Sequence, residues 1–149
     1  MTVKPIPDGY HSVIPYLIVQ GAAALIDFLR HAFDATEKER HAWPDGSIMH
    51  AEVKIGDSTI MLGEARGEWK PMPASIYLYV NDADATFRKA IKAGAVSVME
   101  PADQFYGDRH GGVKDPCGNH WWVATHIEDV PPEELQKRME EYIKKQAKS

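Results

Sequence analysis

The stretch PYLIV at residues 15–19 has a counterpart in IYLYV at residues 76–80. Both runs are short and rich in β-branched and aromatic residues, which is typical of buried strands. Each leads into apolar residues at helical spacing, over residues 21–33 in the first copy and 82–93 in the second. A strand followed by a helix therefore occurs twice, and such repetition predicts a fold built from two copies of one unit.

Strand-like segments follow each predicted helix. They cover about residues 36–43, 48–55 and 59–63 in the first half, and about 96–100, 112–114 and 120–125 in the second. Turn-forming Pro, Gly and Asp residues separate them. We therefore predict an α+β fold, with one domain made of two βαβββ modules at about residues 10–65 and 74–127.

The end of the chain is predicted to form a separate helix at about residues 131–145. Leu135, Met139, Tyr142 and Ile143 fall on one face of this helix, as in an amphipathic helix. Two interpretations stay open, since this face either packs on its own domain or contacts a second copy of the chain.

Composition restricts the classes of function. The chain has 149 residues, of which 44% are hydrophobic, enough for a substantial core. Its net charge is −5 and it has no basic stripe, which argues against nucleic-acid or membrane-surface partners. The apolar stretches are far shorter than the ~20 residues of a membrane span, and the first residues do not resemble a signal peptide. We therefore expect a cytoplasmic protein.

Several motifs point to one superfamily. They are YGDR at 106–109, DPCGNHW at 115–121, ATH at 124–126, HAE at 50–52, IGDS at 55–58 and LIDF at 25–28. Together they resemble the vicinal oxygen chelate superfamily of glyoxalases, bleomycin-resistance proteins and dioxygenases, and more narrowly its PhnB-like branch. The resemblance implies that the sheets curve into a cup that holds a small molecule, often completed across a homodimer.

Metal-using members of that superfamily place His, Gln or Glu ligands at four matching strand positions, where the metal acts as a Lewis acid. The resemblance places Ile14 or Pro15, Ser75 and Trp122 at three of these positions, and only Glu64 offers a carboxylate. A catalytic divalent ion needs about three protein ligands. We therefore expect that the usual metal is lost and that no cofactor is bound.

An alternative assignment keeps a metal. A different strand register would bring together His11, Glu64 and either His120 or His126. The protein would then be a metal-dependent lyase, isomerase or dioxygenase of the same superfamily.

Two pairs of neighbouring charged residues each have two interpretations. His50 and Glu52 alternate on one strand face, and they form either a metal-ligand pair or an ion pair on the sheet. Asp108 and Arg109 follow Tyr106 in a predicted loop. They either form an ion pair that fixes the loop, or Arg109 binds an anionic ligand through its planar set of donors.

Adjacent tryptophans near the end of the second module must face opposite sides of a strand. We expect Trp121 in the core and Trp122 in the cup, where an aromatic wall suits planar or cationic ligands. His120 shares a face with Trp122, and Tyr106 is placed to donate a hydrogen bond into the cup.

Tyr16 and Tyr77 occupy equivalent positions of the repeat. They either line the two halves of the cup or pack under the helices. Trp43 and Trp69 flank the first hairpins, as rim residues or in simple surface packing. The function predicted from these residues is the binding of a small apolar or aromatic molecule in a cup, by a protein that we expect to be a homodimer.

Overall fold

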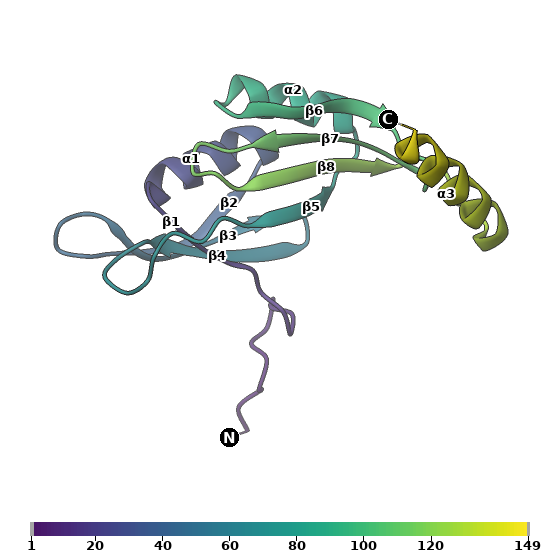
Figure 1. The fold of residues 1–149 in the computed structure, drawn as a ribbon. Helices are drawn as coiled ribbons and strands as arrows, with labels where there is room; N and C mark the ends of the chain where they lie inside the picture. The colour runs from purple at the N-terminus through teal and green to yellow at the C-terminus, as the bar shows by residue number, and fades with distance from the viewer. Residues whose placement is uncertain (1, 149) are drawn as a thin grey trace.

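The computed structural model describes residues 2–148, and Figure 1 shows their fold. In chain order the elements are β1 (Tyr16–Val19), α1 (Ala22–Phe33), β2 (Thr36–Ala42), β3 (Ile48–Ile55), β4 (Ser58–Glu64), β5 (Ser75–Tyr79), α2 (Ala83–Lys92), β6 (Val96–Asp103), β7 (Asp108–Lys114), β8 (His120–His126) and α3 (Pro132–Ala147).

The strands form two sheets with the same topology. Their orders are β1-β4-β3-β2 and β5-β8-β7-β6. In each sheet the first strand is parallel to the last strand of its module, and the other pairs are antiparallel. The predicted α+β fold with two βαβββ modules and a C-terminal helix is therefore confirmed.

Side chains alternate between the two faces along each strand. One face of each sheet is therefore covered by helices, and we call the other the open face. In β1, Leu17 is buried on the helix side, whereas Tyr16 points to the open face and is exposed. Trp121 of β8 is fully buried, and its ring lies 5.0 Å from that of Phe33 in α1. Because α1 also packs against α2, the two modules share one continuous core.

Two strands of the second module are longer than predicted. β6 continues to Asp103 despite Pro101, because the pairing with β7 shifts register between Met99 and Ala102. A proline is tolerated at such an irregularity, since its missing N–H is not needed in the ladder. β7 begins at Asp108, so Asp108 and Arg109 lie in a strand and not in the predicted loop.

The C-terminal helix α3 extends from the far end of the module-two sheet (Figure 1), and none of its residues is buried. Arg138 attaches it to the domain through the carboxylate of Glu128, at 2.9 Å, and the carbonyl of Phe105, at 3.1 Å. Tyr142 stacks on Phe105 with 5.1 Å between ring centroids. Within the described chain, no helix is long and apolar enough to cross a membrane.

Candidate functional site

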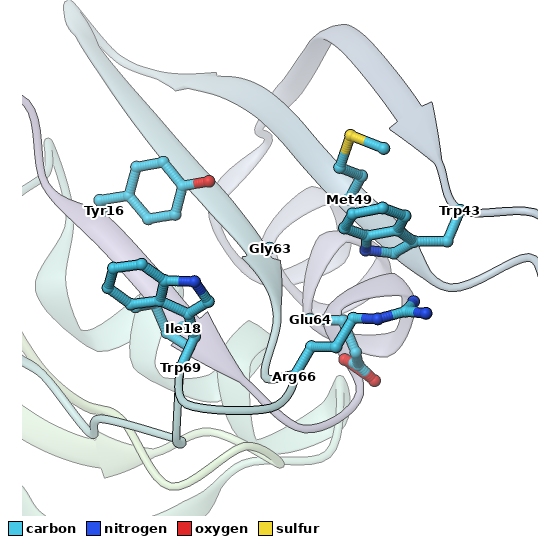
Figure 2. Close-up of a pocket in the computed structure, with 8 residues that line it drawn as sticks. All are labelled: Tyr16, Ile18, Trp43, Met49, Gly63, Glu64, Arg66 and Trp69. Carbon is cyan, nitrogen blue, oxygen red and sulfur yellow. The ribbon is translucent and has the colours of Figure 1, made fainter.

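The open face of the module-one sheet carries an apolar pocket of about 590 Å³ (Figure 2). The residues that line it are Tyr16, Ile18, Trp43, Met49, Gly63, Glu64, Arg66 and Trp69. Small-molecule sites have volumes of about 300–1,000 Å³ and mostly apolar walls. The pocket therefore has the size and the chemistry of such a site.

Aromatic side chains form the walls of this pocket. Figure 2 shows Tyr16 and Trp69 on one side and Trp43 on the other, beside Met49. The guanidinium of Arg66 lies 4.3 Å from the centroid of the Trp43 ring, a cation–π contact that holds the indole in place. Trp69 is 64% exposed, so much of its indole surface is free to contact a ligand.

Gly63 forms the floor of the pocket between these walls. A Cβ at this position would lie 2.7 Å from the backbone carbonyl oxygen of Met49 and 3.5 Å from the Tyr16 hydroxyl. A side chain here would therefore collide with the backbone of β3 and fill the space beside Tyr16. Glycine keeps the pocket open.

The open face of the module-two sheet carries a polar cluster around Asp108, which is 3% exposed. The hydroxyls of Tyr77 and Tyr79 donate to Oδ2 of Asp108 at 2.7 and 2.8 Å, and Nδ1 of His126 lies 2.8 Å from Oδ1. Burial acts to raise the pKa of Asp108, but these hydrogen bonds outweigh it and hold the pKa below its usual range. Asp108 is therefore a buried carboxylate with three partners.

His110 and Trp122 lie beside this cluster. Their rings stack at 5.9 Å, and Nε2 of His110 lies 3.4 Å from the Tyr106 hydroxyl. Burial lowers the pKa of His110. Within residues 2–148, its Nδ1 is buried without a hydrogen-bond partner. Gly112 makes room for the Trp122 ring, because a Cβ at Gly112 would lie 2.5 Å from that ring.

The predicted ligand-binding residues therefore lie on two separate open faces. Tyr16 lines the module-one pocket, whereas Tyr77, Tyr106 and Trp122 lie on the module-two face. His120 also lies there, with its ring 6.2 Å from that of Trp122. The structure does not bring the two sets together within one chain.

Arg109 does not pair with Asp108. Its guanidinium pairs with Asp84 of α2, at 2.9 Å, and with Asp103, at 3.0 Å. Asp108 points to the opposite face of β7, because consecutive strand residues alternate. The predicted Asp108–Arg109 ion pair is therefore wrong. The donors of Arg109 hold α2 against the sheet, and binding of an anionic ligand by Arg109 stays a prediction.

Sequence reasoning missed several residues of these faces. Tyr79, Asp108 and His110 were not recognised as one cluster, because the predicted strand began four residues too late. With β7 starting at Asp108, alternation alone places Asp108 and His110 on the face of Trp122. Trp43 and Trp69, expected at the rim or in surface packing, form opposite walls of the pocket.

A comparison with family models decides the family. The model of the Glyoxalase/Bleomycin resistance protein/Dioxygenase superfamily matches residues 10–123. The chain belongs to this superfamily. The resemblance proposed from its motifs is therefore confirmed.

Relatives of this glyoxalase-superfamily chain occur in mycobacteria. Protein Mb0911c of Mycobacterium bovis and protein Rv0887c of Mycobacterium tuberculosis are each 40% identical to it over 136 residues. The alignments cover 84% of this chain, with 90% of the first relative and 80% of the second.

Solved structures share the superfamily fold. TioX from Micromonospora superimposes with a TM-score of 0.68 at 22% identity, covering 78% of this chain and 99% of TioX. The PhnB protein from Bacillus cereus superimposes with a TM-score of 0.63 at 16% identity, covering 77% of this chain and 99% of PhnB. At these identities the likeness shows the fold alone.

The superfamily's usual metal does not fit the residues of this chain. Both carboxylate oxygens of Glu64 accept backbone N–H groups at the start of α1. The N–H of Gly21, which precedes the helix, lies 3.0 and 2.8 Å from them, and that of Ala22 lies 3.0 Å from one. Oγ of Ser75 accepts the indole N–H of Trp122 at 2.9 Å. The polar groups at these positions are therefore occupied by the protein itself.

The alternative ligand set does not assemble either. Nε2 of His126 is bonded to Asp129 at 2.7 Å, and its Nδ1 is bonded to Asp108. His11 lies in a different cavity, of about 430 Å³, beside Tyr10 and Glu52. Among the described residues, His11, Glu64, His120 and His126 form no group with metal-ligand spacing. Within one chain these residues therefore do not converge.

Proposed function

We propose that this protein binds a small planar aromatic molecule in the module-one pocket, without the metal that other members of its superfamily use at the matching positions. The observation that carries the proposal is the apolar pocket of about 590 Å³ between Tyr16, Trp43 and Trp69. Aromatic pairs prefer offset or edge-to-face packing, which suits a flat ligand between indole rings.

The floor and the charges of the pocket support the same ligand class. Gly63 leaves a shallow slot next to Met49, whose flexible thioether adapts to ligands of different shape. Arg66 is held over Trp43 and forms an ion pair with Asp45 at 3.7 Å, and Glu64 also lines the pocket. A neutral, planar apolar molecule therefore matches the pocket best.

We propose further that the protein works as a homodimer, in which the module-two face of one copy closes over the module-one pocket of the other. Tyr77, Tyr106, His120 and Trp122 would then contact the ligand from the partner copy. The exposed apolar residues of α3 support a second copy as the occupant of this surface. They are Met139, Tyr142 and Ile143.

A metal-dependent lyase, isomerase or dioxygenase is the alternative from the same superfamily. Such an enzyme needs Glu64 as a ligand, and Glu64 is committed to the start of α1. The geometry therefore favours ligand binding over metal chemistry at the superfamily's positions.

A titration with the neutral fluorescent probe N-phenylnaphthylamine tests the pocket. We expect saturable binding to the wild type, and about tenfold weaker binding to Trp69→Ala, because a large aromatic contact is lost at an exposed position. Val96→Ala, at an exposed site of β6, is the matched control and leaves the affinity unchanged. Equal affinities for the wild type and Trp69→Ala would contradict the proposal.

Sedimentation and a second variant test the dimer. The monomer has a mass of 16.7 kDa, and we expect a species of about twice this mass at micromolar concentration. In a dimer, Trp122→Ala also weakens probe binding, although Trp122 lies outside the module-one pocket. A purely monomeric protein, or full affinity in Trp122→Ala, would contradict the shared cup.

A further inference from the structure

Two histidines and two glutamates form a square on β2 and β3, apart from the superfamily's metal positions. Glu39 and His41 lie on β2, and His50 and Glu52 lie on β3. The register pairs Glu39 with Glu52 and His41 with His50 directly across the two strands. We call these four residues the histidine–carboxylate square.

Three residues of the square have the spacing of metal ligands. Nε2 of His50 lies 2.9 Å from Oε2 of Glu52, and Nε2 of His41 lies 2.7 Å from Oε2 of Glu39. One ligand atom from each of Glu39, His50 and Glu52 lies within 4.8 Å of the other two. Adjacent ligands around an ion bound at about 2.1 Å are about 3 Å apart, so these atoms fit one coordination sphere with little movement.

The charges of the square favour a cation. Like charges placed directly opposite on neighbouring strands repel each other, and Glu39 and Glu52 are such a pair. In the described chain their ion pairs are with His41 and His50 only. Arg40, the nearest arginine in sequence, pairs with Glu37 instead. Lys38 lies over the Tyr10 ring, 4.1 Å from its centroid, so among residues 2–148 no lysine or arginine forms an ion pair with the two carboxylates.

Glu52 is almost fully buried, with 5% of its surface exposed. Its Oε1 accepts a hydrogen bond from the Tyr10 hydroxyl, and its Oε2 lies 2.9 Å from Nε2 of His50. A buried carboxylate that is fixed beside an imidazole is well placed to bind a divalent metal.

A second layer of contacts orients the square. Nδ1 of His50 lies 3.1 Å from the hydroxyl of Tyr16, which also lines the module-one pocket. Metal-bound histidines typically have such a partner on the ring nitrogen that does not bind the metal. This leaves Nε2 of His50 facing Glu52. The cavity of about 430 Å³ that Glu52 and Tyr10 line gives solvent a route to the carboxylate.

We propose that the histidine–carboxylate square binds one divalent transition-metal ion through Glu39, His50 and Glu52, while His41 supports Glu39 from beside the site. Mixed imidazole and carboxylate ligands suit zinc and its neighbours in the first row better than magnesium or calcium. The site is distinct from the positions of Glu64 and Ser75, and it does not depend on the proposed ligand of the aromatic pocket.

Zinc titration of the metal-free full-length protein tests this site, with calorimetry and elemental analysis after dialysis. We expect one Zn²⁺ per chain, with a Kd below about 10 µM. Glu39→Gln should weaken the affinity by about tenfold or more, because it removes a charged ligand from a partly exposed position. Glu37→Gln, on the same strand, is the matched control and should bind zinc like the wild type.

Histidine side-chain NMR detects zinc binding independently of the heat measured by calorimetry and of any enzymatic activity. We expect Zn²⁺ to shift the resonances of the His50 ring nitrogens, while those of His120 stay unchanged. Circular dichroism shows whether Glu52→Gln, a change at a buried position, still folds. If it does not fold, the zinc affinity of Glu39→Gln alone tests the proposal. No saturable zinc binding by the wild type, or undiminished binding by Glu39→Gln, would overturn the proposal.

Discussion

Glu64 binds the start of helix α1 through Gly21, whose backbone N–H lies 3.0 and 2.8 Å from the two carboxylate oxygens. The first N–H groups of a helix lack partners within the helix, and a carboxylate there also interacts favourably with the helix dipole. The residue that the superfamily comparison suggested as a metal ligand is thus part of the architecture of module one.

Removal of this carboxylate should cost stability and leave zinc binding intact. We expect Glu64→Ala to lower the free energy of unfolding by about 1–2 kcal/mol, because the N–H groups of Gly21 and Ala22 lose their acceptor. Urea denaturation measures the loss, with Glu68→Ala in the exposed linker as the control. Unchanged stability together with a loss of bound metal would contradict the structural role of Glu64.

The tyrosines that donate to Asp108 should also contribute to stability. Tyr77→Phe removes one donor from a buried carboxylate, and we expect a loss of about 1 kcal/mol. Tyr142→Phe, on the exposed helix α3, serves as the control. The idea fails if both variants unfold at the same urea concentration as the wild type.

The pH dependence of stability should report on His126. Hydrogen bonds with Asp108 and then Asp129 raise the pKa of His126. A raised pKa in the folded state means that the stabilisation is fully present below the unfolded value of about 6.5, and is lost as the pH rises through the folded value. Thermal melts should therefore show a decrease in Tm above about pH 6.5 that is reduced in His126→Gln. The same decrease in His126→Gln as in the wild type would refute this assignment.

Cys117 should be chemically inert. Burial, followed by the charges of Asp115 and Glu64, raises the pKa of its thiol to about 11. Its Sγ also lies 3.3 Å from the carbonyl oxygen of Gln20, which joins the turn of module two to module one. We expect iodoacetamide to modify it more than about tenfold more slowly than a free cysteine near pH 8, because little thiolate is present. Alkylation at the rate of a free thiol would contradict this.

The fold was predictable because its signals are local. The two copies of the strand that contain Tyr16 and Tyr77 repeat the same alternation, and the adjacent tryptophans at 121 and 122 had to face opposite sides of β8. The structure places Trp121 in the core and Trp122 on the open face.

The site was less predictable because it depends on how a linker folds, where a strand begins and how two strands are paired. The periodicity of the sequence does not determine these features. Trp69 reaches the pocket because the linker folds back, with backbone bridges from Arg66 to Trp69 and from Ile18 to Met72. The start of β7 at Asp108 depends on the irregular pairing around Pro101. The Glu39–Glu52 contact needs the register of β2 against β3, which a bulge shifts after Glu37.

The most direct test of the account is to fill the module-one pocket from within. Met49 lines the pocket and is 41% exposed, so Met49→Trp adds bulk to the pocket without entering the core. We expect titration with N-phenylnaphthylamine to show no saturable binding to this variant, while its circular dichroism spectrum and Tm match those of the wild type. Wild-type affinity in a folded Met49→Trp would contradict the claim that this pocket is the ligand site.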